Sequence, residues 1–195
     1  MPSSPKIPKE KILQTALNLI IRDGYDAVNI KTVAKELGCS TQPVSWHFGN
    51  MEGFRKALAE YALNYANSKL LSITESGIYT FLNMGIGYIE IAFEEPNLFC
   101  YLYMNGGSGF QFGHISMLSD TGASAIIAQK IADQLNMSRK EVSGYVRDII
   151  IYTHGLACFI ASGLISTPKE EVIEMIKNVA YTMFGDRLKG ENQII

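Results

Sequence analysis

The stretch GCSTQPVSWHF, residues 38–48, decides how this chain folds. Gly38 ends a short helical pattern that runs through the preceding residues KTVAKEL, and Ser40 can cap the helix that follows. That next helix, expected over about Thr41–His47, is barely two turns long and carries small and polar residues before Trp-His-Phe. Two short helices set by such a turn are the arrangement with which helix-turn-helix proteins read DNA. The stretch therefore predicts a DNA-reading helix.

The residues around this stretch follow the helical period, and no segment alternates like a strand between hairpin turns. We therefore expect an all-α chain. A first helix is expected over Pro8–Asp23, and Asn29 should cap the short second helix. A long helix over about Asn50–Ser72 would join this front to a helical body. The expected domains are 6–66, a three-helix helix-turn-helix DNA-binding domain, and 76–187, a ligand-binding and dimerisation domain.

The second domain is expected to contain five helices, over Ile78–Glu94, Asn97–Met104, Thr121–Asn136, Arg139–Leu164 and Lys169–Phe184. Capping boxes at 138–141 (SRKE) and 167–170 (TPKE) mark the starts of the last two. The helix that starts at Arg139 is apolar nearly all round, so it should be buried nearly all round. The last two helices could form a four-helix bundle with their copies in a second molecule. The alternative is that they pack only within one molecule.

The composition is that of a well-buried globular chain, with 47% apolar and 18% charged residues. No apolar run approaches the roughly 18 residues that span a membrane, and the N-terminus does not resemble a signal peptide. Three scattered cysteines are too few for a disulfide or zinc framework, namely Cys39, Cys100 and Cys158. We therefore expect a cytoplasmic protein with reduced thiols, no metal, no cofactor and no membrane partner.

The charges are distributed unevenly along the chain. Up to Glu60, eight Lys and Arg outnumber six Asp and Glu, whereas the remainder carries nine against thirteen. A mildly basic front on an acidic body fits a small DNA-contacting module better than a protein that coats nucleic acid.

The front of the chain, from about Lys6 to Ala66, resembles the TetR family of bacterial transcriptional regulators. The matching positions are Ala16, Gly24-Tyr25, Asn29, Val33-Ala34, Leu37-Gly38, Ser40, Pro43-Val44, His47-Phe48, Asn50 and Leu58. The second domain resembles the members whose C-terminal domain carries a Trp-His-Gly motif. That similarity rests on FEEPNLF at 93–99 and YTHGL at 152–156, where Tyr152 and Thr153 replace the expected Trp region.

The resemblance implies a homodimeric, non-enzymatic regulator that dimerises through its last two helices. It would be a repressor that a small apolar molecule releases from a palindromic double-stranded DNA operator. Gln42 could pair bidentately with adenine. The residues that would face the major groove are Thr41, Gln42, Pro43, Val44 and Ser45. The residues that would contact phosphates are Lys31, Thr32, Trp46, His47 and Lys56. For Trp46 and Phe48, packing against the first helix is the alternative.

Two positions depart from the family pattern. Ser45 stands where Tyr is usual, and Met51 stands where Lys is usual. Both positions typically touch DNA phosphates in the family. The missing lysine should therefore make DNA binding less salt-dependent than in a typical relative.

Soft and aromatic side chains of the second domain could line an apolar cavity, or they could form ordinary core. The expected pocket residues are Met84, Tyr88, Phe99, Tyr103, Met104, Phe110, Met117, Tyr152, His154 and Phe159. The glycine-rich segment 105–113 follows a helix and lacks a Gly-Lys-Ser ending. We therefore expect a connector or lid there rather than a phosphate loop.

Two other functions fit parts of the sequence. Cys39 lies in the turn of the expected DNA reader, where its oxidation would disturb the fit to DNA, so the chain could be a redox-sensing regulator. An enzyme could use His154 and Cys158, which are four residues apart on a helix. However, no nucleophile-base-orienter trio, metal cluster or cofactor motif accompanies them, and a buried core pair is the alternative.

Overall fold

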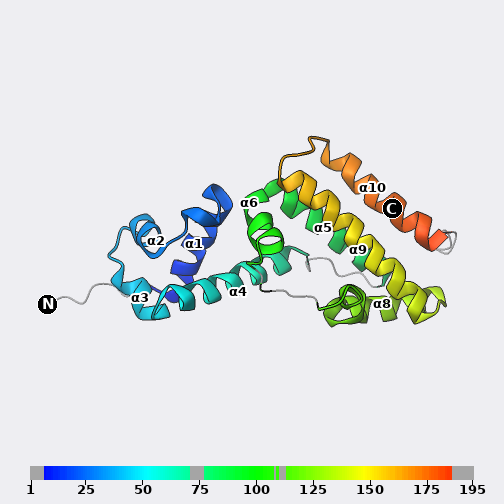
Figure 1. Ribbon diagram of the computed structural model, residues 1–195, viewed down its shortest axis with the longest axis horizontal. Helices are drawn as coiled ribbons and strands as arrows, with labels where there is room; N and C mark the ends of the chain where they lie inside the picture. The colour runs from blue at the N-terminus through cyan, green and yellow to red at the C-terminus, as the bar shows by residue number, and fades with distance from the viewer. Residues whose placement is uncertain (1–6, 71–76, 108, 110–112, 186–195) are drawn as a thin grey trace. The chain divides into compact units, whose positions relative to one another are not determined.

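The computed structural model describes residues 7–70, 77–107, 109 and 113–185 (Figure 1). Every regular element within these residues is helical, which confirms the all-α prediction. The contacts divide the chain into two compact units, with Met1–Ser68 and Glu95–Phe110 in the first and Lys69–Glu94 and Gln111–Ile195 in the second. The segment that begins at Glu95 therefore makes its contacts within the first unit. The functional domain boundaries stay a prediction.

The first unit packs its helices around one apolar core. Its helices are α1 (Lys9–Asp23), the 3-10 turn η1 (Tyr25–Ala27), α2 (Ile30–Glu36), α3 (Gln42–Phe48), most of α4 (Met51–Leu70), α6 (Pro96–Phe99) and the π-helix η2 (Cys100–Met104). Each of the first four α-helices contributes to the core at least one side chain with 0% exposure, among them Ile12, Val33, Val44, Phe54 and Leu58. Burial of these side chains fixes which face of each short helix points inward.

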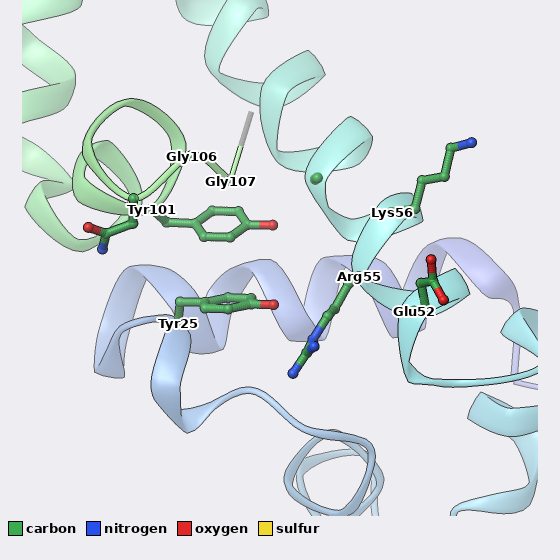
Figure 2. A pocket seen from close by; sticks show the side chains of 9 residues that line it. Tyr25, Glu52, Arg55, Lys56, Tyr101, Gly106 and Gly107 are labelled. Atoms are coloured by element: carbon green, nitrogen blue, oxygen red, sulfur yellow. The ribbon is translucent and has the colours of Figure 1, made fainter. Parts of the chain in front are cut away.

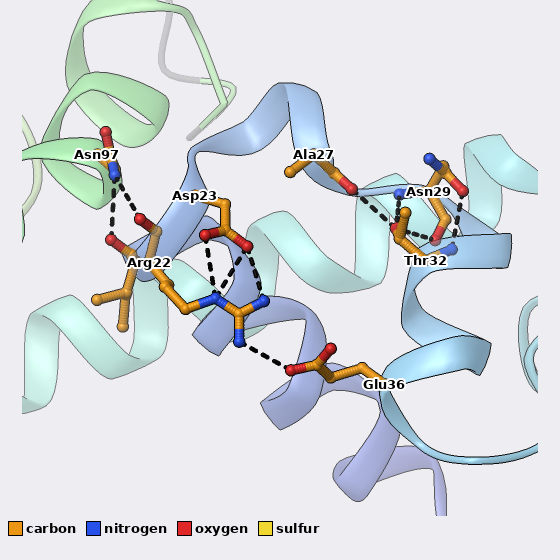
Figure 3. Close-up of polar contacts among 8 residues, drawn as sticks. Arg22, Asp23, Ala27, Asn29, Thr32, Glu36 and Asn97 are labelled. Carbon is orange, nitrogen blue, oxygen red and sulfur yellow. Dashed lines mark hydrogen bonds and ion pairs between the residues drawn. The ribbon is translucent and has the colours of Figure 1, made fainter.

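The start of α2 is fixed by the capping box of Asn29. Its side-chain oxygen accepts hydrogen bonds from the backbone N–H groups of Lys31 and Thr32, both at 3.0 Å. The Thr32 hydroxyl accepts the Asn29 backbone N–H at 3.0 Å in return (Figure 3). Two otherwise unpaired donors of the first turn and the Asn29 N–H are thereby satisfied, and the predicted cap is confirmed.

The second unit packs its helices around a second core. Its helices are α5 (Ile78–Glu94), α7 (Met117–Asp120), α8 (Gly122–Leu135), α9 (Arg139–Ala161) and α10 (Lys169–Phe184). Helix α9 contacts α5, α7, α8 and α10. The core is lined by fully buried apolar side chains, including Ile78, Ile131, Val142, Val146 and Phe184. Helices α5 and α10 have the bounds expected from the sequence.

Several elements differ from expectation, three of them most clearly. Helix α9 ends at Ala161 rather than Leu164, because Gly163 adopts a φ of +71° and donates its N–H to the Ile160 carbonyl. The helix expected over Asn97–Met104 begins one residue earlier, and its last turns widen into the π-helix η2. The short helix α7 was not expected.

The capping box expected at 167–170 is wrong. Helix α10 starts at Lys169 as expected, but its N-cap is Pro168, which has no side-chain hydrogen bond to donate or accept there. The Thr167 hydroxyl instead donates to the Glu171 carboxylate at 2.7 Å. At the other predicted box, the Ser138 hydroxyl accepts the Glu141 N–H at 3.2 Å, as a cap should.

Candidate nucleic-acid interface

Helix α3 is held in place by its inner face. Val44 is 0% exposed and belongs to the core. The ring of Phe48 meets that of Phe54 in α4 edge-on, with 5.1 Å between the centroids, and the Lys9 ammonium lies 5.5 Å from the Phe48 ring centroid. Phe48 therefore packs against α4 and also lies beside Lys9 of α1, whereas the alternative stated for it was packing against the first helix. These contacts fix the rotation of α3 about its axis.

The outer face of α3 is polar and exposed apart from one large ring. The side chains of Thr41, Gln42 and Ser45 are exposed, and Pro43 is half-buried at the first turn. Trp46 is 68% exposed, more than any other aromatic side chain described in the chain. A short helix with a buried inner face and an exposed polar outer face is the shape that enters a major groove.

The turn between α2 and α3 is a Schellman motif. The Cys39 N–H donates to the Ala34 carbonyl at 3.0 Å, and the Gly38 N–H donates to the Lys35 carbonyl at 3.1 Å. Gly38 has a φ of +65°, a left-handed conformation that favours glycine. The turn thus depends on backbone geometry, and the half-buried thiol of Cys39 is not required by it. Nothing in this geometry favours a redox role for Cys39.

The other end of α3 depends on a glycine that sequence reasoning missed. A Cβ atom on Gly53 would lie 2.3 Å from the Phe48 carbonyl oxygen. Asn50 caps α4 by accepting the Gly53 N–H at 2.9 Å, so the end of α3 is pressed against the first turn of α4. Glycine disfavours helix formation, so its presence in the first turn of α4 was a hint that a side chain does not fit there. One such glycine is only a weak signal in the sequence.

The predicted phosphate contacts have different surroundings. Lys31 and Lys56 are exposed. The Thr32 hydroxyl is already occupied, since it donates toward the Ala27 carbonyl at 2.8 Å and accepts from the Asn29 N–H (Figure 3). The Nε2 atom of His47 lies 2.8 Å from the Ile7 carbonyl oxygen, which ties the last turn of α3 to the chain that precedes α1. Among these residues, the lysines are the most available for a phosphate.

A polar network joins α1, α2 and α6 behind the reading helix. The Arg22 guanidinium donates to Asp23 at 2.7 Å and to Glu36 at 2.8 Å. The Arg22 hydrogen bonds hold the pKa of Asp23 below its ordinary value. The Asn97 side-chain amide donates to the carbonyl oxygens of Ile21 at 3.1 Å and Arg22 at 3.4 Å (Figure 3). Sequence reasoning missed Asn97, because a single asparagine after a proline carries no sign of its distant partner.

An open hollow of about 370 Å³ lies in the first unit (Figure 2). Its wall includes the stacked rings of Tyr25 and Tyr101, whose centroids are 4.5 Å apart. Burial raises the pKa of Tyr101 to about 12, although the Arg55 charge opposes this shift. Gly107 lines the hollow as well, and a Cβ there would lie 2.4 Å from the Tyr101 carbonyl oxygen. Lys56 is the only residue of this wall that the sequence had singled out for a site.

The residues expected to line an effector pocket are divided between the two units. In the first unit, the rings of Phe99 and Tyr103 are 5.2 Å apart, and Met104 is 43% exposed. In the second unit, the Tyr88 hydroxyl lies 2.9 Å from Nδ1 of His154. Met84, Met117 and Tyr152 are half-buried and Phe159 is 47% exposed, while Phe110 lies outside the described residues.

The described residues contain no group of three or more His, Cys, Asp or Glu side chains that could hold a metal ion. None of the described helices is long and apolar enough to cross a membrane.

Comparisons with known proteins agree with this geometry. Residues 12–58 match the family model described as bacterial regulatory proteins, tetR family. Similar solved structures include a TetR-like transcriptional regulator from Rhodococcus sp. RHA1, with 12% identity, a TM-score of 0.60, and coverage of 92% of this chain and 99% of that one. Another, from Rhodococcus sp. and assigned to the TetR family, has 16% identity, a TM-score of 0.60, and coverage of 90% and 98%. No curated protein matches the chain significantly. Residues 12–58 are therefore similar to the helix-turn-helix domain of the bacterial tetR-family regulatory proteins, and the described residues form an all-helical fold like that of the TetR-like structures.

Proposed function

We propose that the chain is a homodimeric transcriptional repressor that binds a palindromic DNA operator and is released from it by a small, largely apolar molecule. One observation carries the DNA-binding part of the proposal. Helix α3 buries Val44 completely while it leaves Gln42, Ser45 and Trp46 exposed. Gln42 would pair with an adenine and the exposed lysines would contact phosphates, so sequence readout and affinity would come from different residues.

The proposed dimer rests on exposed apolar side chains near the end of the chain. They lie on α9, on α10 and on the connection between them, and they are Ile151, Phe159, Leu164, Ile165 and Met175. Several large apolar side chains left exposed on two helices that contact each other are typical of a surface that a partner covers. A second copy is the partner that a palindromic operator requires, because each half-site needs its own reading helix.

The proposed release mechanism uses the segment 95–104. In the chain, this segment lies between α5 and α7 of the second unit, yet Asn97 donates hydrogen bonds to the end of α1. A ligand that shifts this segment would pull on α1 and hence on the core that holds α3. The ligand must bind the released conformation more tightly than the DNA-bound one, because only a difference in affinity shifts the equilibrium.

Two finer features complete the proposal. The second unit would belong to the Trp-His-Gly type, with Tyr152-Thr153-His154-Gly155 on α9 as its version of the motif. The protein would act in the cytoplasm, where its operator lies.

The proposal is tested by fluorescence anisotropy with a labelled inverted repeat from the promoter of the chain's own gene. We expect nanomolar to ten-nanomolar binding that weakens as salt rises, with about one unit less salt slope for Lys31→Ala. Lys140→Ala removes an equally exposed lysine from α9 and is the matched control, for which the slope should not change. Equal affinity for the repeat and for a scrambled duplex would contradict the proposal.

A further inference from the structure

We propose that Cys158 is a reactive thiol that adds covalently to small apolar α,β-unsaturated carbonyl compounds, with His154 as its base and Tyr88 positioning the imidazole. The chemistry does not depend on DNA binding. Its consequence for regulation rests on the proposed function, since the adduct would then be a covalent form of the effector-bound state.

The geometry places an imidazole between a thiol and a phenol. His154 and Cys158 are four residues apart on α9, so they lie on the same side of the helix. The Sγ atom of Cys158 is 3.5 Å from Nε2 of His154. On the other side of the ring, the Tyr88 hydroxyl from α5 lies 2.9 Å from Nδ1, and the two rings are 6.1 Å apart. Each ring nitrogen therefore has its own contact.

This arrangement suits a neutral imidazole that accepts the thiol proton. When Nδ1–H donates to the Tyr88 hydroxyl oxygen, the lone pair of Nε2 faces the thiol. Burial lowers the pKa of His154, which favours the neutral ring, the form that has a lone pair to accept a proton. In that tautomer, Tyr88 holds the imidazole through Nδ1–H while His154 can act as a base through Nε2.

The proposed step is a conjugate addition. Sγ of Cys158 attacks the β carbon of the unsaturated carbonyl compound and forms a C–S bond, while the thiol proton passes to Nε2 of His154. The electron pair of the C=C bond moves onto the carbonyl as an enolate. The proton on Nε2 then returns to the α carbon, which leaves a thioether and a neutral imidazole. No oxidant or reductant takes part.

The surroundings fit an apolar reagent. Cys158 is a free cysteine and is half-buried rather than sealed in the core. The next residue along α9, Phe159, is apolar and 47% exposed in the single chain. A compact apolar compound with a reactive double bond matches this combination better than a charged one does.

The two other cysteines are internal controls with similar, intermediate exposure. The Cys39 side chain has no imidazole contact among the described residues. Cys100 has its sulfur 3.5 Å from the Met104 sulfur, and burial raises the pKa of its thiol. A lower fraction of thiolate makes a cysteine less nucleophilic. Exposure alone would therefore rank the three cysteines alike, whereas the proposed contacts put Cys158 first.

The experiment treats the full-length protein with substoichiometric N-ethylmaleimide at pH 7 and follows the three cysteines by peptide mass spectrometry. Cys158 should be alkylated about tenfold faster than Cys39 or Cys100. This is a modest rate enhancement for a positioned base. His154→Asn should remove most of that advantage. Tyr88→Phe, which keeps the ring and removes the hydroxyl, should slow Cys158 selectively and leave the rate at Cys39 unchanged.

If Tyr88 or His154 had a purely structural role, its substitution would loosen the second unit and speed alkylation of Cys158, so it would not mimic a selective slowing. If Cys158 reacts no faster than Cys100 in the wild-type chain, or if neither substitution slows it, the proposal is wrong. This readout needs no DNA, so its failure would leave the operator-binding result untouched. If the wild-type chain does not bind the operator but its Cys158 is still the fastest-reacting cysteine, only the repressor proposal is refuted.

Discussion

The two units place exposed apolar side chains in different settings. In the first unit, Trp46 stands on a two-turn helix among polar residues, and its neighbour Val44 is fully buried. In the second unit, Ile151 and Phe159 stand on α9, whose opposite side buries Val146 and Ala157. A lone exposed ring on a polar face suits a nucleic acid, whereas several exposed apolar groups on long helices suit another protein surface. The same measure of exposure therefore indicates two kinds of partner.

The largest effect on stability should come from a large-to-small substitution in the core of the first unit, with the core of the second unit left intact. Phe54→Ala removes a ring with 0% exposure from the first unit and should cost about 3–5 kcal/mol of its unfolding free energy. We expect operator binding to be lost while the dimer persists, because the exposed apolar groups of α9 and α10 are untouched. Thermal unfolding and light scattering measure the two outcomes. Loss of the dimer together with DNA binding would show that the two units do not act separately.

The next largest effect is expected at Gly53, where the first turn of α4 lies close to the Phe48 carbonyl group. Gly53→Ala forces a Cβ against the Phe48 carbonyl oxygen, so it should lower the unfolding free energy by about 1–3 kcal/mol and weaken operator binding. Gly144→Ala in α9 meets no atom within 4 Å and is the matched control. It should be neutral or stabilising by up to about 1 kcal/mol, because alanine favours helix. Urea unfolding of both variants measures the difference in unfolding free energy. Equal stability of Gly53→Ala and Gly144→Ala would contradict the prediction.

A smaller effect, confined to recognition, is expected at Gln42. Gln42→Ala should cost about 1–3 kcal/mol of operator binding and relax the preference at one base pair in each half-site. The side chain is exposed, so the thermal stability should stay the same. Anisotropy with operators altered one pair at a time measures the specificity. A uniform loss across all sequences would assign Gln42 to a phosphate instead.

The smallest effect is a pH dependence in the second unit. Burial lowers the pKa of His154, so the unfolded chain binds more protons than the folded one below the ordinary histidine pKa of about 6.5. The contribution of neutral His154 to the unfolding free energy should therefore be fully present above that pH. It should be lost as the pH drops toward the lowered pKa of His154 in the folded chain. Melting temperatures at pH 7.5 and 5.5 should differ more in wild type than in His154→Asn. An identical pH response in both proteins would remove His154 as the cause.

Much of the first unit could be predicted from the sequence because its signals are local. The cap at Asn29 and the stop at Gly38 depend on residues within one turn, and both are confirmed. The inward face of Val44 was not recognised, because a helix of seven residues is too short for its apolar period to separate the two faces. Its assignment to the major groove was therefore made from the resemblance alone.

The contacts that were hardest to predict, in either unit, join distant parts of the chain. The contact between Tyr88 and His154 links residues 66 positions apart. Asn97 and the α1 carbonyls are about as far apart in sequence, with separations of 75 and 76 residues. No periodicity or cap reports such pairs. The pocket predicted for the effector stays a prediction for the same reason.

The central claim is that the exposed face of α3 enters the DNA groove, and photo-crosslinking tests it most directly. Placing p-benzoylphenylalanine at position 46 should give a covalent adduct with a bound inverted-repeat duplex on irradiation. The same group at position 126, where Ile126 is 61% exposed on α8, should give none. Crosslinking from position 126 and not from position 46 would contradict the account.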